Sequence, residues 1–243
     1  MDSGRSDGWA KSARAWITEL GERGDYNREF VLDSPMIARV QRRKYRMALD
    51  VGCGEGRFCR MLRSSGIQTV GIDPTEAFIE HAIRKDPAGD YQLGCAERLA
   101  FPDGLFDLVI CYVSLVNILD IGRAIREISR VLQPGGTLLI ANLNSFVTAG
   151  FPDGWIERAD GTSSFDIDRY SEVRAEWVSW ADIRVQNWHR PLSAYMSLLL
   201  EQGLELRHFS EPLPGGGDPT QAERFRRVPY FLIMEWQKPL LAR

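Results

Sequence analysis

MALDVGCGEGR, residues 47–57, joins a short apolar segment to a run of alternating glycines. The apolar segment reaches Asp50, and Gly52, Gly54 and Gly56 then follow at every second position. Glycine lets a backbone turn sharply and approach a ligand that a Cβ atom would push away. At the carboxyl end of a first parallel strand, such a turn lies where doubly wound sheets bind nucleotides. We therefore expect the ligand of this protein at the glycine turn.

The spacing of these glycines separates two classes of nucleotide. A dinucleotide fold requires G-x-G-x-x-G, with a helix N-terminus facing a pyrophosphate. Here the pattern is G-x-G-x-G, with Asp50 two residues before it and Glu55 inside it. Acids at these positions suit a ligand without phosphates. The spacing therefore argues against an NAD-dependent oxidoreductase.

Apolar runs alternate with amphipathic segments along most of the chain, which predicts strands and helices in turn. The expected strands are 46–51, 68–73, 91–94, 106–112, 137–143, 204–209 and 228–236. The expected helices are 9–20, 58–64, 75–85, 120–132 and 191–202, with another beginning at Asp33-Ser34-Pro35, where Asp or Ser caps and Pro fits the first turn. This order predicts an α/β fold with a doubly wound, mostly parallel seven-stranded sheet, helices on both faces, an N-terminal helical segment and an inserted cap after the fifth strand.

Composition limits the partners that the protein can have. The chain has 243 residues and a formal net charge of −3, so it has no overall attraction to phosphate backbones, which argues against a nucleic-acid partner. The only dense basic run is RVQRRKYR, residues 39–46, which we expect to form the solvated face of a helix before the first strand. Nothing in the sequence indicates an oligomeric state.

Cysteine usage and hydropathy bear on metals and location. The four cysteines form no C-x-x-C pair and no histidines stand at ligand spacing, so we expect no metal. No disulfide framework is indicated, and reduced thiols suit a cytoplasmic protein. The first sixteen residues lack the apolar core of a secretory signal, and no window approaches 18 apolar residues, so we expect no membrane span.

Further motifs follow the glycine turn in a fixed order. Asp73 ends the second expected strand, where an acid can accept two hydrogen bonds from a ribose diol. Then come GCAE at 94–97, FPDGLFDLVICY at 101–112 and LQPGGTLLIAN at 132–142. In order and spacing these motifs resemble the class I S-adenosylmethionine (SAM) dependent methyltransferases of the small-molecule type. The resemblance implies SAM as cofactor, S-adenosylhomocysteine as product and no metal.

The resemblance also implies a cofactor site. The turn would approach the methionine and ribose of SAM, Asp73 would hold the ribose hydroxyls, and Tyr112 matches a position near the methionine. Arg28, before the first strand, is the candidate for the cofactor carboxylate, which a guanidinium matches bidentately. A surface arginine is the alternative for Arg28, and a core aromatic for Tyr112. The expected cofactor-binding residues are Arg28, Asp50, Gly52, Cys53, Gly54, Asp73, Pro74, Cys95, Ala96, Glu97 and Tyr112.

One position departs from the family pattern. Many family members have Asp where this chain has Cys95, and a thiol is a poor acceptor for the adenine amino group. Either Glu97 or a backbone group takes that role, or the contact is lost.

The block 145–190 is rich in Gly, Asp and aromatic residues, and part of it alternates as a hairpin does. Aromatic faces stabilise cations such as the sulfonium and stack on flat substrates, although tryptophan also packs in ordinary cores. The expected substrate-binding residues are Trp155, Trp177, Trp180, Trp188 and Asn142. His189 is the candidate general base, since an imidazole titrates near neutrality; a local hydrogen bond or helix cap is the alternative.

We expect four segments: an N-terminal helical cap (1–45), a SAM-binding core (46–144), an aromatic-rich substrate insertion (145–190), and a C-terminal helix with the last two strands (191–243). The leading hypothesis is methyl transfer to N or O of a small aromatic or heterocyclic metabolite by in-line displacement. One alternative is a tRNA or RNA methyltransferase that would bind the RNA through residues 39–46. Another is a non-catalytic SAM-binding partner protein. DNA adenine methylation is disfavoured, because CYVSLVNILD at 111–120 lacks the D/N-P-P-Y/F motif.

Overall fold

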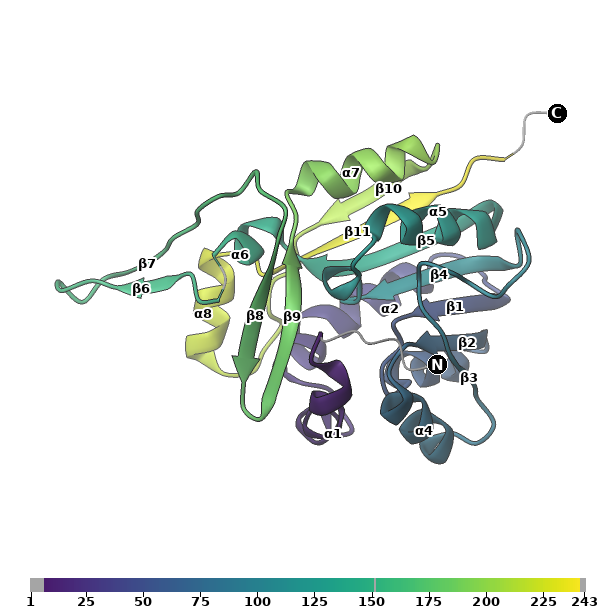
Figure 1. Cartoon of the computed structure of the whole chain (residues 1–243), viewed down its shortest axis with the longest axis horizontal. Coiled ribbons are helices and arrows are strands. Elements are labelled where there is room, and N and C mark those ends of the chain that lie inside the picture. The colour runs from purple at the N-terminus through teal and green to yellow at the C-terminus, as the bar shows by residue number, and fades with distance from the viewer. Residues whose placement is uncertain (1–6, 151, 241–243) are drawn as a thin grey trace.

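The structure, a computed structural model, describes residues 7–150 and 152–240. Its main sheet contains β1 (Met47–Val51), β2 (Gln68–Asp73), β3 (Asp90–Leu93), β4 (Phe106–Tyr112), β5 (Leu132–Leu143), β10 (Glu205–Ser210) and β11 (Phe231–Gln237). The strand order is β10-β11-β5-β4-β1-β2-β3 (Figure 1). The neighbours from β3 to β5 pair in parallel, whereas β11 is antiparallel to both β5 and β10. The predicted mostly parallel seven-stranded sheet is confirmed.

Helices cover both faces of this sheet, as predicted. On one face lie α5 (Ile121–Val131) and α7 (Leu192–Glu201), and on the other α2 (Asp33–Val40), α3 (Arg57–Ser64) and α4 (Glu76–Lys85). In α5 the buried residues recur three and four positions apart, at Ala124, Ile125 and Ile128, which gives the helix one apolar face. Asp120 begins α5 by accepting a hydrogen bond from the Arg123 amide at 2.9 Å.

The N-terminal segment contains α1 (Trp9–Leu20), with the predicted bounds. The helix expected to begin at Asp33 does begin there, but a π-helical turn over Arg28–Leu32 continues directly into it. Asp33 is therefore not a cap, and that prediction is wrong. Its carboxylate instead accepts hydrogen bonds from Arg57 Nη1 at 3.0 Å and from the Tyr112 hydroxyl at 2.8 Å.

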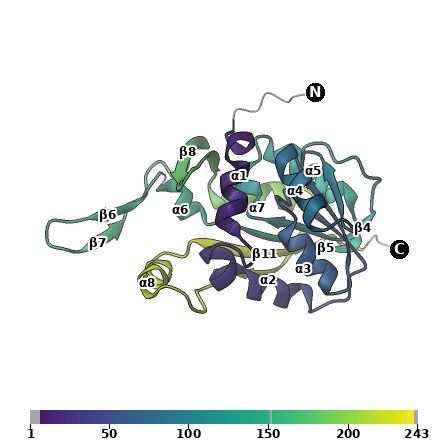
Figure 2. The ribbon, with the colours of Figure 1, turned by 90° about the horizontal axis from the view of Figure 1, so that it is seen from below.

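The block after β5 contains α6 (Ser145–Ala149) and two antiparallel pairs. β6 (Trp155–Glu157) and β7 (Ser163–Phe165) form a ribbon that extends away from the body of the protein (Figures 1 and 2). β8 (Arg174–Trp180) and β9 (Ile183–His189) form a hairpin, and β9 packs against α1, α6 and the helical turn Leu115–Asn117 that follows β4. The hairpin thus crosses the carboxyl ends of the central strands.

The helix α8 (Pro219–Arg227), which lies between β10 and β11, was not predicted. Asp218 caps this helix by accepting the Gln221 amide at 2.8 Å, and Pro219 occupies its first turn. The Asp-Pro pair that begins this helix comes directly after three glycines. Glycines are typical of loops and therefore obscured the helix start in the sequence.

Arginines of the basic run 39–46 form contacts within the fold. The run leads into the amino end of β1, whereas the glycine turn follows the carboxyl end of that strand. Arg39 donates from Nε and Nη2 to Glu235 Oε2 at 2.8 and 2.6 Å, and Arg43 donates to the Thr137 hydroxyl at 3.0 Å. Among the described residues no helix is long and apolar enough to cross a membrane.

The Arg39–Glu235 ion pair joins α2 to β11, with side chains only 15% and 11% exposed. Arg39→Met should lower the free energy of unfolding by about 2 kcal/mol, because the Glu235 carboxylate would stay mostly buried without its partner. Urea denaturation measures this change. Arg42→Met, at an exposed position of the same run, is the control; equal losses in both variants would show that the ion pair does not stabilise the fold.

Candidate active site

The glycine turn after β1 is shaped by one contact and one opening. Gly52 has φ +77°, and a Cβ atom there would lie 2.5 Å from the Ser114 Cβ atom, so only glycine fits against the loop after β4. Gly54 has φ +55°, and a Cβ atom there would meet nothing within 4 Å. The turn is therefore held on one side by Ser114 and open on the other.

Asp73, at the end of β2, fixes the open side of the turn. Its Oδ2 accepts the Gly54 amide at 3.0 Å and its Oδ1 accepts the Thr75 amide at 2.8 Å. Burial raises the pKa of Asp73 to about 6, against the effect of these two amides. A carboxylate oxygen has two acceptor positions, so each oxygen can accept a further hydrogen bond from a ligand.

Asp50, at the end of β1, is a buried carboxyl with one unused oxygen. Oδ2 lies 3.3 Å from the Cys59 thiol, whereas Oδ1 has no hydrogen-bond partner in the described part of the chain. Burial raises the pKa of Asp50 to about 7. Because buried polar atoms are normally paired, we expect Oδ1 to accept a hydrogen bond from a ligand in the adjoining cavity.

A first cavity opens around this turn at the carboxyl ends of β1, β2 and β4. Ten of the eleven predicted cofactor residues line it, the exception being Cys95. Cys95 instead forms an isolated bridge with Arg98, and its neighbours Ala96 and Glu97 face the cavity. The fold thus brings together residues from five separate segments of the chain.

Arg28 and Tyr112 lie against each other in the lining of this cavity. The Arg28 guanidinium lies 5.6 Å from the Tyr112 ring centroid and 4.8 Å from that of Trp16, and its Nη1 donates to both Asp25 oxygens at 3.1 Å. Tyr112 also stacks on Phe58, with centroids 4.7 Å apart. Burial raises the pKa of Tyr112, so the group is a phenol. Arg28 is therefore an anchored, mostly buried cation.

A second cavity of about 640 Å³ adjoins the first, within the usual size of small-molecule pockets. Residues from α1, from the segment before α2 and from the loop after β4 line both cavities: Trp9, Trp16, Arg28, Val113 and Asn117. The β8–β9 hairpin, α8 and the start of β11 complete the second cavity.

The tryptophans that line these cavities differ from those predicted. Trp180 alone of the four in the insertion lies in the lining of the second cavity. The Trp155 indole donates to the Tyr230 hydroxyl at 2.6 Å, and the rings of Trp177 and Trp188 lie beneath arginines at 4.6 and 4.9 Å. These three residues and Asn142, which is buried in β5, lie outside both linings.

Trp9 and Trp16 line both cavities but were not among the predicted residues. Both lie on the apolar stripe of α1, which the helical spacing of Trp9, Ala13, Trp16 and Leu20 does indicate. What that stripe covers depends on tertiary packing. α1 lies on the β8–β9 hairpin, with the Trp16 and Trp180 ring centroids 6.0 Å apart, and on α4, with those of Trp9 and Phe78 5.8 Å apart.

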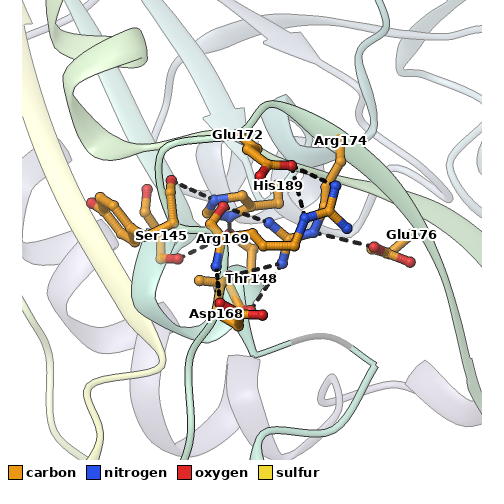
Figure 3. A network of polar contacts seen from close by, with 10 residues as sticks. Ser145, Thr148, Asp168, Arg169, Glu172, Arg174, Glu176 and His189 are labelled. Atoms are coloured by element: carbon orange, nitrogen blue, oxygen red, sulfur yellow. Dashed lines mark hydrogen bonds and ion pairs between the residues drawn. The ribbon is translucent and has the colours of Figure 1, made fainter.

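His189 lies in a polar network between α6 and the hairpin, shown in Figure 3. Its ring is fully buried, and Nε2 donates to the Tyr170 carbonyl at 2.8 Å. Burial lowers the pKa of His189, so the ring is neutral and Nδ1 accepts from the Thr148 hydroxyl at 2.7 Å. With both nitrogens engaged and neither cavity reached, the structure gives His189 a local hydrogen-bonding role and does not support the predicted general base.

The loop after β4 is held by hydrogen bonds from a buried cation, the Arg190 guanidinium. Arg190, 3% exposed, donates to the carbonyls of Leu115, Ile118 and Leu119 at 3.3, 2.5 and 3.1 Å. The loop begins at Val113, whose φ of +58° is strained for a β-branched residue. Arg190 therefore maintains the shape of the segment that both cavities share.

Fold and site together define a doubly wound α/β protein whose first cavity lies where the strand order reverses between β1 and β4, the usual place of ligand sites in such sheets. In the described part of the chain no group of three or more His, Cys, Asp or Glu side chains could hold a metal.

Residues 49–140 match the family described as a methyltransferase domain. A malonyl-(acyl-carrier protein) O-methyltransferase from Serratia marcescens is 35% identical over 115 residues, which cover 46% of this chain and 44% of that protein. A ubiquinone biosynthesis O-methyltransferase from Bradyrhizobium diazoefficiens is 31% identical over 100 residues, 40% and 39% of the two chains. The chain thus spans less than half the length of these curated relatives.

The overall fold is similar to that of a SAM-dependent methyltransferase from Mesorhizobium loti, with a TM-score of 0.71 and 22% identity over 96% of this chain and 98% of that one. The matched residues 49–140 run from β1 into β5 and so include the glycine turn.

Arg190→Met should lower the free energy of unfolding by about 3 kcal/mol, because three backbone carbonyls lose a charged donor. Arg190→Lys should recover only part of the loss, since an ammonium is a compact charge without the guanidinium fork. Urea denaturation compares both with Arg126→Met, an exposed arginine on α5. A loss in Arg190→Met no larger than that of Arg126→Met would contradict this role.

Proposed function

We propose that this protein transfers a methyl group from SAM to O or N of a small aromatic or heterocyclic metabolite. The observation that carries the proposal is the pair of adjoining cavities with five shared lining residues at the carboxyl edge of the sheet. One cavity fits the cofactor, the other fits the acceptor, and the shared lining marks where methyl and nucleophile would meet.

Residues of the first cavity suit SAM in charge and in hydrogen-bonding groups. Asp73 would accept from the ribose hydroxyls while it holds the turn, and the open side of Gly54 leaves room for the nucleoside. The unpaired Asp50 oxygen would accept from the methionine ammonium, and the Arg28 guanidinium would bind its carboxylate. Pro74, Ala96 and Glu97 would contact the adenine; with Cys95 outside the lining, Glu97 is the acidic side chain available to it.

Bound SAM supplies an already activated methyl group on its sulfonium, so the protein mainly aligns the acceptor and excludes water. Trp9 and Trp16 line both cavities, and their ring faces would stabilise a cation between them. None of the three histidines lines either cavity. This lining favours acceptors that need little help to lose a proton, such as phenols, and the two curated relatives are O-methyltransferases.

The alternatives have less support. A tRNA or RNA methyltransferase would need a basic surface beside the active edge, and residues 39–46 lie at the opposite edge with two arginines engaged in the fold. A non-catalytic SAM-binding protein would not need the second cavity. NAD remains disfavoured by the glycine spacing.

Isothermal titration with S-adenosylhomocysteine tests the cofactor assignment, and labelled SAM with a metabolite pool tests turnover. We expect binding by the wild type, and a loss of about 1–3 kcal/mol in Asp73→Ala from the unpaired ribose hydroxyls and the freed turn. Asp90→Ala, exposed on the neighbouring strand, is the control. Binding of NAD instead would sink the proposal, and cofactor binding without any methylated product would favour the non-catalytic alternative.

Binding of SAM should also release protons near neutral pH. Because the pKa of Asp50 is about 7, its carboxyl is roughly half protonated at that pH, and a cation beside it favours the charged form and lowers the pKa. Proton release should be greatest below pH 7, between the lowered and the free pKa, amount to about half a proton at pH 7, and fade towards about pH 9, where the group is already ionised. Titration in phosphate and Tris buffers measures the released protons. If Asp50→Asn releases as many as the wild type, another group is responsible.

A further inference from the structure

We propose that the methyl acceptor carries a carboxylate and that Arg224 and Tyr230 bind it. Both residues line the second cavity and neither lines the first, so the carboxylate lies away from the methyl group. The acceptor would then be a flat aromatic or heterocyclic acid whose O or N nucleophile stands at the other end. This assignment rests on the proposed function of the two cavities.

Tyr230 supplies a directed donor. The Trp155 indole nitrogen, which can only donate, donates to the Tyr230 hydroxyl at 2.6 Å, so the hydroxyl oxygen accepts and its own proton is available. Burial raises the pKa of Tyr230, which keeps this proton in place. The ring is fixed by its stack on Phe225, with centroids 4.2 Å apart and planes 10° apart.

Arg224 supplies a positive charge without a counterion. Its guanidinium lies 5.5 Å from the Trp155 ring centroid, at an exposed position on the last turn of α8. Within residues 7–150 and 152–240 no ion pair or hydrogen bond of its side chain is found. Arg28 and Arg227 differ from it, since Arg28 is paired with Asp25 and Arg227 donates to Ser163.

The acids that line the same cavity are already engaged. Asp25 accepts two hydrogen bonds from Arg28, and Asp218 caps α8 through the Gln221 amide. The last turn of α8 carries Arg224, Arg226 and Arg227, which adds to the positive potential at this end.

A carboxylate matches the donors that remain. One guanidinium fork and one phenol hydroxyl can together satisfy its two oxygens and its single charge. The same cavity is also lined by the rings of Trp180, Phe225 and Phe231, which suit a flat apolar body. An acid of this shape would direct its far end towards Trp9 and Trp16, where the cofactor cavity begins.

The test compares matched acids and amides on the protein saturated with S-adenosylhomocysteine. The probes are 3,4-dihydroxybenzoate and 4-hydroxycinnamate, each beside its carboxamide, titrated by calorimetry. At least one acid should bind about tenfold more tightly than its amide, the effect of one charge-assisted interaction. Arg224→Gln should abolish that preference and Tyr230→Phe should reduce it, with amide binding little changed by Arg224→Gln. Arg226→Gln, exposed on the same helix and outside the lining, should keep it.

The assignment is overturned if neither acid binds more tightly than its amide, or if Arg226→Gln removes the preference as fully as Arg224→Gln. The affinity for S-adenosylhomocysteine, measured first in each variant, should match the wild type, since neither Arg224 nor Tyr230 lines the cofactor cavity. A wild type that does not bind that compound would refute the proposed function itself, and this outcome is distinct from a cofactor-loaded protein that ignores the carboxylate.

Discussion

The close contact between residue 52 and the loop after β4 is the constraint on which the rest of the site depends. A Cβ atom at Gly52 would lie 2.5 Å from that of Ser114, whose hydroxyl donates to the Val51 carbonyl at 2.6 Å. This contact brings the ends of β1 and β4 together at the point where the strand order reverses. The carboxyl of Asp73 then holds the other side of the turn. Two short connections thus become the floor of one ligand cavity, without any contribution from the insertion.

The cover of that cavity comes from parts of the chain that are far apart in sequence. The Ser12 hydroxyl on α1 donates to the Arg184 carbonyl on β9 at 3.1 Å, and Val178, Ile183 and Val185 pack with Trp16 in a small apolar cluster. Arg190, at the end of the same hairpin, supports the loop from Leu115 to Leu119. The hairpin therefore contacts both α1 and the loop after β4. Because these two elements line both cavities, the position of the hairpin affects the shape of both.

Local pattern predicted the core well, because strands such as Gln68–Asp73 and Phe106–Tyr112 are apolar runs bounded by polar or glycine residues. The residues that the family resemblance implied for the cofactor lie together, except for Cys95, because the carboxyl ends of parallel strands meet at one edge of the sheet. The lining of the second cavity depends on tertiary packing that no local pattern encodes. The insertion has four tryptophans, yet α1 supplies Trp9 and Trp16 to the site. The role of His189 was not predictable from local pattern either, because its hydrogen-bond partners are Thr148 and Tyr170, 41 and 19 residues away in sequence.

The shared lining has a thermodynamic consequence. A side chain that touches two ligands cannot be ordered by one of them without changing its freedom to meet the other, so the two binding free energies are not independent. By thermodynamic reciprocity, each ligand changes the affinity of the protein for the other by the same factor. Arg28, ring-stacked and ion-paired at the boundary, is the residue through which this cooperativity would pass most directly.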